Sequence, residues 1–117
     1  MPLNNGINNT EINKNMIISI VTLATKEING VVEIAEQPFY KLRKMFNRNV
    51  GKGVCIKMTN LGLVIDTYVV VEIGFEAADV VYRVQQNIKN TMSSMLDLPI
   101  KAINVHIMDA EKHKIKD

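Results

Sequence analysis

The sequence has few of the residues from which reaction centres and cross-links are built. Its 117 residues include one cysteine, two histidines and no tryptophan. The single cysteine, Cys55, excludes an intramolecular disulfide and a zinc cluster of several thiolates within one chain. The apolar runs, such as 16–18 and 69–71, are far shorter than the ~20 residues that span a bilayer. Residues 1–10 lack the basic and apolar regions of a secretion signal. We therefore expect a cytoplasmic chain, which can still contact the inner face of the membrane.

What is present is typical of one soluble globular domain. An apolar fraction of 47% and a charged fraction of 22% are ordinary for such proteins, and 117 residues suffice for one core. The first residues are polar and rich in asparagine. We expect a flexible leader at 1–11, a single domain at 12–109 and a polar tail at 110–117.

Two alternating runs dominate the second half of the chain. Residues 53–59 and 62–73 carry apolar side chains at every second position, which is typical of half-buried strands. The turn at 60–62 predicts that these runs form a hairpin over 53–73. In the longer run the face predicted to be buried consists of Leu63, Ile65, Thr67, Val69, Val71 and Ile73.

Two other stretches have the three- and four-residue spacing of amphipathic helices. The first follows Asn13, a favourable N-cap, and ends at the αL pair 29–30. The second spans 77–96, and Pro99 forces the chain out of it. The predicted apolar stripes are Met16, Ile17, Ile20, Leu23, Ala24 and Ile28 in the first helix, and Val80, Val81, Val84, Ile88, Met92, Met95 and Leu96 in the second.

Shorter elements complete the prediction. They are a strand at 31–35, a helix that begins near Pro38 and a last strand at 103–108, which the helix at 77–96 can join in parallel to the strand at 62–73. The fold class is therefore α+β. We expect a mainly antiparallel sheet of three or four strands, with two long helices packed on one face and a short central helix.

The most functional-looking segment is basic. Six cations and no acidic residue lie between residues 41 and 57, and aromatic residues alternate with them, as in contacts with nucleic acid or a membrane surface. If the cations serve contact, they should form one exposed patch, with Phe39, Leu42 and Phe46 turned inward. Each cation near an anionic membrane adds at most about 1 kcal/mol, which favours a location assisted by a partner. A merely solvated face is the open alternative. The candidate contact residues are Lys41, Arg43, Lys44, Arg48 and Lys52.

No residues have the pattern of a catalytic, cofactor-binding or metal site. The segment 51–53 lacks the ending of a phosphate-binding loop. Asp66 and Glu72 would lie about 20 Å apart along one strand, too far for an acid–base pair. Cys55 and His106 are best interpreted as residues on a sheet surface, although His106 could approach an acid of the neighbouring strand. We predict a protein that is not an enzyme and needs no cofactor; an enzyme built on Cys55 or His106 is the least favoured reading.

As a whole, the order of elements resembles the alkaline-shock or glucose-starvation stress protein family of Gram-positive and related bacteria. The resemblance covers about residues 12–109. The segments that carry it are Glu27-Ile28-Asn29-Gly30-Val31, Lys52-Gly53-Val54, the strand 65–71 with a later Gly74, Val84-Gln85-Gln86-Asn87-Ile88-Lys89, and Ile103-Asn104-Val105-His106-Ile107.

The resemblance implies a small non-enzymatic cytoplasmic protein of the envelope stress response or of cell-envelope homeostasis. Its partners would be other proteins, such as a membrane anchor, or copies of itself, and peripheral membrane contact fits the same role. The resemblance supplies no catalytic residue. A basic domain that binds RNA or DNA through phosphates is the alternative, although the chain has no Gly-x-x-Gly clamp and no aromatic pair on alternating strand positions for base stacking.

Overall fold

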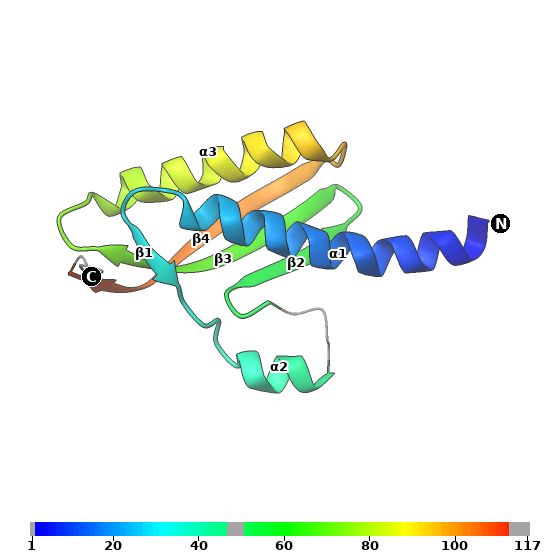
Figure 1. Cartoon of the computed structure of the whole chain (residues 1–117), viewed down its shortest axis with the longest axis horizontal. Helices are drawn as coiled ribbons and strands as arrows, with labels where there is room; N and C mark the ends of the chain where they lie inside the picture. The colour runs from blue at the N-terminus through cyan, green and yellow to red at the C-terminus, as the bar shows by residue number, and fades with distance from the viewer. Residues whose placement is uncertain (1, 47–50, 113–117) are drawn as a thin grey trace.

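A four-stranded sheet carries two long helices side by side on one face, as Figure 1 shows for the computed structural model. The structure describes the backbone of residues 2–46 and 51–112, and side chains within that part from Lys14 onward. The α+β prediction is confirmed. In chain order the elements are α1 (Pro2–Lys26), β1 (Val31–Ile34), α2 (Tyr40–Phe46), β2 (Val54–Thr59), β3 (Gly62–Glu72), α3 (Ala77–Met95) and β4 (Ile100–Glu111).

The strand β3 is the centre of the sheet. Its first half pairs antiparallel with β2, with Ile56 opposite Ile65, and its second half pairs antiparallel with β1, with Ile34 opposite Val69. Its other edge pairs with β4 in parallel along nearly the whole strand. Both the hairpin over 53–73 and the parallel connection through α3 are therefore as predicted. Since β1 and β2 share one edge of β3, the chain between them has to leave the sheet, and α2 lies in that excursion (Figure 1).

The core lies between the sheet and the two long helices. One face of β3 is buried from residue 63 to residue 71 at every second position, as its alternation predicted, and β2 adds two residues to it. The helices contribute residues at steps of three and four, so each presents one stripe to the sheet. The helix residues of the core are Ile17, Ile20, Val21 and Ala24 from α1 and Val80, Val84, Ile88 and Met92 from α3.

Several predicted details are wrong at the ends and flanks of elements. The helix α1 begins at Pro2 rather than after Asn13. Extending a helix that is already nucleated adds one hydrogen bond per residue with no new nucleation cost, so even weak helix formers such as asparagine can continue it. Its stripe is centred on Val21, which turns Met16 and Leu23 toward solvent. Met58, Ile73 and Met95 are also exposed, since each lies where its element reaches or passes the edge of the core.

Candidate functional site

The segment around α2 presents its apolar side chains to solvent, against the prediction that they turn inward. The exposed fractions are 74% for Phe39, 54% for Leu42, 78% for Met45 and 82% for Phe46. The helix contains no buried residue and stands away from the two-layer body (Figure 1). The segment forms a helix as its pattern predicted, but this helix does not pack against the sheet or the long helices. The orientation predicted for Phe39, Leu42 and Phe46 is therefore wrong.

The cations of this segment lie beside that apolar surface. Lys41, Arg43, Lys44 and Lys52 are all exposed, whereas Arg48 lies outside the described residues. The Lys44 ammonium donates to the Tyr40 hydroxyl at 3.2 Å and lies 5.5 Å from the centre of the same ring. Both apolar and cationic side chains are thus available for contact on one short helix.

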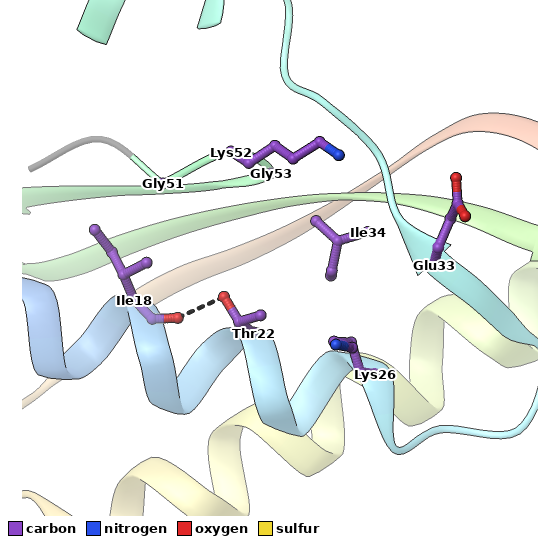
Figure 2. A pocket seen from close by; sticks show the side chains of 8 residues that line it. All are labelled: Ile18, Thr22, Lys26, Glu33, Ile34, Gly51, Lys52 and Gly53. Atoms are coloured by element: carbon purple, nitrogen blue, oxygen red, sulfur yellow. Dashed lines mark hydrogen bonds between the residues drawn. The ribbon is translucent and has the colours of Figure 1, made fainter.

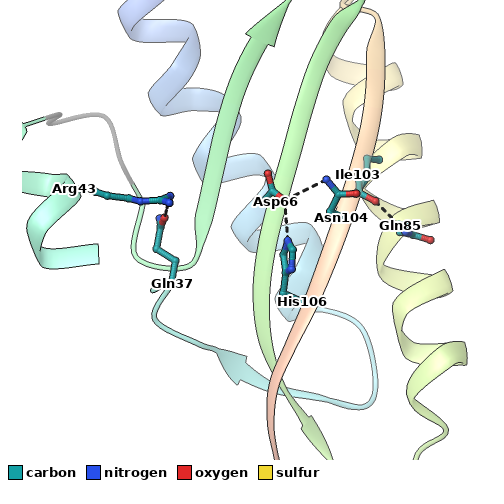
Figure 3. A network of polar contacts seen from close by, with 7 residues as sticks. All are labelled: Gln37, Arg43, Asp66, Gln85, Ile103, Asn104 and His106. Atoms are coloured by element: carbon teal, nitrogen blue, oxygen red, sulfur yellow. Dashed lines mark hydrogen bonds and ion pairs between the residues drawn. The ribbon is translucent and has the colours of Figure 1, made fainter. Parts of the chain in front are cut away.

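A buried glutamine ties the segment before α2 to the segment before β2. Gln37 is only 1% exposed, and its amide nitrogen donates to the Gly51 carbonyl oxygen at 2.6 Å. Its amide oxygen accepts from Arg43 Nη1 at 2.9 Å (Figure 3), and its backbone N–H donates to the Lys52 carbonyl oxygen at 2.8 Å. Sequence reasoning missed this role, because one glutamine before a proline has no pattern. Arg43 therefore serves partly as a structural tie rather than only as a contact.

Phe39, the residue directly before α2, has an unusual backbone conformation. Its φ is +60°, in the left-handed region that side chains other than glycine rarely adopt. Such a conformation costs on the order of 1–2 kcal/mol and persists where the surrounding structure imposes it. Here the bonds of Gln37 on one side and the helix on the other hold it.

A hollow of about 410 Å³ opens between α1, β1 and the segment 51–53. Figure 2 shows Ile18 and Thr22 from α1 on one side of it and the segment 51–53 on the other. The Thr22 hydroxyl donates to the Ile18 carbonyl oxygen at 2.7 Å, so it is already occupied. Cations from Lys26 and Lys52 and the carboxylate of Glu33 share the rim. The mixed charge gives this hollow no clear preference for one class of ligand.

A polar cluster lies on the face of the sheet that α1 and α3 do not cover. The side chain of Asp66 accepts from Asn104 Nδ2 at 3.2 Å and lies 2.8 Å from His106 Nε2 (Figure 3). The His106 ring stacks on Tyr68, with 4.5 Å between the ring centres. The approach of His106 to an acid of β3, which the sequence left as a less favoured alternative to a lone surface histidine, is therefore the arrangement observed, and Asp66 is that acid.

Burial raises the pKa of the Tyr68 hydroxyl above its ordinary value of 10.0, and the negative charges of Asp66 and Cys55 add to the rise, while Arg43 opposes it. Cys55 lies opposite Asp66 in the β2–β3 register. Among the hydrogen bonds of the described residues, none joins Cys55 to His106, so the two are not arranged as a nucleophile and its base. The cluster has the form of a half-buried surface network.

Two further features of the described residues bear on the site. Within 14–46 and 51–112, no three side chains of the metal-binding types come together. No helix in that part of the chain is both long and apolar enough to cross a bilayer.

Comparison with known proteins identifies relatives over most of the chain. The alkaline shock protein 23 family, described as having a cell envelope-related function, matches residues 3–111. The uncharacterized protein YqhY of Bacillus subtilis is 35% identical over 84% of this chain and 73% of its own length. The uncharacterized protein Spy1614 of Streptococcus pyogenes serotype M6 is 31% identical over 85% of this chain and 84% of its own length. No solved structure matches. The resemblance found in the sequence is therefore confirmed at family level.

Proposed function

The chain belongs to the alkaline shock protein 23 family, and we propose that it takes part in that family's cell envelope-related function by contact rather than by catalysis. It is a cytoplasmic interaction protein that works at the inner face of the membrane. Its partners are other proteins, such as a membrane anchor or further copies of the chain. The family match supports the link to the envelope, and the structure supports the mode of action.

The observation that carries this proposal is the exposed apolar surface of α2. Monomeric soluble proteins rarely leave large apolar side chains clustered in solvent, and such clusters usually mark contact sites. Phe39, Leu42, Met45 and Phe46 form a cluster of this kind on seven helical residues and the one before them. The strands β1 and β2 directly precede and follow this segment in the chain, yet these side chains do not pack against them. A surface retained in this way fits a contact role.

The test is affinity capture with the tagged full-length chain from separated membrane and cytosolic fractions of cells that express it. We expect envelope proteins to be enriched over a capture with the double variant Leu42→Ser/Phe46→Ser. Recovery of ribosomes or RNA without envelope proteins would contradict the proposal and favour the nucleic-acid alternative.

A second variant, Cys55→Ala/His106→Ala, addresses catalysis. It should leave the captured set unchanged and support normal growth, and a growth defect with an unchanged captured set would point to an enzyme.

A further inference from the structure

We infer that α2 is a docking element for the anionic surface of a lipid bilayer. The inference goes beyond the proposed function, which does not specify what α2 contacts. The proposed function would stand if α2 contacted a protein. It also revises the expectation that this segment contacts the membrane through its cations only and that a partner has to assist the location. That expectation assumed that the apolar side chains of α2 are buried.

The apolar half of the argument comes from spacing and exposure. Met45 and Phe46 follow Leu42 at three and four positions, so these side chains lie on one side of the helix, and Phe39 directly precedes the helix. All four are large and more than half exposed. An amphipathic helix that lies in the membrane interface buries such a side at the boundary between headgroups and acyl chains. The helix stands off from the body (Figure 1), so this side can reach a flat surface.

The charged half of the argument selects the occupant. Lys41 and Lys44 are exposed on the polar side of the same helix, where basic residues are typical of interfacial helices, and no acidic residue occurs from residue 37 to residue 65. An anionic headgroup layer complements this charge along the whole segment. A second copy of the chain docked through α2 would bring lysines against lysines, which is unfavourable. Charge complementarity therefore favours an anionic bilayer over self-association at this surface.

The contacts that restrain the start of α2 suit a rigid docking element. Gln37 ties the start of the segment to Gly51 and to Arg43, and Phe39 is held in the left-handed region. These restraints fix the helix before it meets a surface, so less conformational freedom is lost on docking. With four side chains and a few cations, binding should be reversible, no stronger than the ~10⁴ M⁻¹ of a single myristoyl chain.

Because the chain contains no tryptophan, one introduced tryptophan reports its own surroundings. The variants are Phe46→Trp on α2 and, as a matched control, Tyr82→Trp on α3; these positions are 82% and 60% exposed. Phosphatidylglycerol vesicles should shift the emission of Phe46→Trp to shorter wavelength, and nitroxide-labelled lipid should quench it. Tyr82→Trp should show neither change. No response of Phe46→Trp, or an equal response of both variants, would overturn the inference.

Co-sedimentation with anionic and neutral vesicles measures separately what the apolar side chains and the lysines of α2 contribute to binding. Leu42→Ser/Phe46→Ser should weaken binding about tenfold or more, whereas Leu23→Ser/Leu61→Ser, at exposed positions elsewhere, should not. These four positions are exposed, so the variants should melt like the parent.

Lysine variants test the charge. On anionic vesicles Lys41→Gln/Lys44→Gln should weaken binding by up to about fivefold per lysine, and Lys89→Gln/Lys101→Gln should change it less. Equal losses in both pairs would show net charge, not α2, to be responsible, and would overturn the inference. A parent that captures envelope proteins from cells but does not bind vesicles would also overturn it, while the proposed function would stand.

Discussion

At Gly53 the backbone passes so close to β1 that a side chain has no space. An added Cβ would lie 2.1 Å from Ile34 Cγ2 and 2.3 Å from the Ala35 carbonyl oxygen. Tyr68 of β3 bonds to both segments here: its N–H donates to the Gly53 carbonyl oxygen at 2.8 Å, and its carbonyl oxygen accepts from the Ala35 N–H at 2.8 Å. One missing side chain thus lets two strands share an edge of β3 and sets where the segment bearing α2 leaves the sheet.

We expect Gly53→Ala to lower the free energy of unfolding by about 1–3 kcal/mol, because the clash is with backbone as well as with a side chain. Gly74→Ala is the matched control. Nothing lies within 4 Å of a Cβ at Gly74, but its φ is +107°, so its cost should be about 1 kcal/mol of backbone strain only. Urea unfolding of both variants measures the difference. A smaller loss for Gly53→Ala than for Gly74→Ala would contradict the close approach.

The ionisation of Tyr68 should make the stability of the folded chain depend on pH in the alkaline range. Its pKa is raised above 10.0, chiefly by burial, so above about pH 10 the unfolded chain loses this proton before the folded chain does. The folded state then binds more protons, and stability falls as pH rises through the raised pKa. We expect urea unfolding to show a steeper loss of stability from about pH 9 to about pH 11 in the parent than in Tyr68→Phe. Parallel curves would show that Tyr68 does not contribute.

At the level of elements, patterns that depend on one core were predictable. The faces of β3 followed from alternation, because a strand with one apolar face has only one way to bury it. The contacts of α2 were not, since a short amphipathic helix has the same sequence whether it faces a core or a partner. The pairing of Asp66 with His106 also escaped a firm prediction. It depends on the β3–β4 register, which shifts between residues 63 and 64 and between 69 and 70.

The two faces of β3 should respond oppositely to a charge. Val69 is fully buried under the helices, so Val69→Asp places a carboxylate in the core and should cost several kcal/mol. Val64 lies on the other face, opposite Lys57, and is only half-buried. Val64→Asp should therefore cost about 1 kcal/mol or less, since the new carboxylate can reach water and a cation. Thermal melts of the pair measure this contrast, and equal losses would refute the assignment of faces.

For the whole molecule, the distribution of charge matters more than its sum. The formal net charge is only +2, yet the chain from residue 37 to residue 65 carries cations alone while both flanking regions contain acids. A molecule polarised in this way can orient toward an anionic surface before contact. The same feature would also attract nucleic acid, so charge alone does not separate the two partners. The apolar side of α2 distinguishes a membrane from nucleic acid, because salt weakens contacts between charges but does not weaken the burial of apolar side chains.

The two partners should therefore differ in how salt affects binding. With three exposed lysines on this surface, Lys41, Lys44 and Lys52, binding to single-stranded RNA should have a log–log salt slope no steeper than about −2. It should weaken about twentyfold between roughly 50 and 200 mM salt. Binding to anionic vesicles should instead fall to a plateau that Leu42→Ser/Phe46→Ser removes. Filter binding and co-sedimentation over one salt series measure both. An RNA slope of about −4 or steeper, with no vesicle plateau, would identify this surface as a nucleic-acid interface instead.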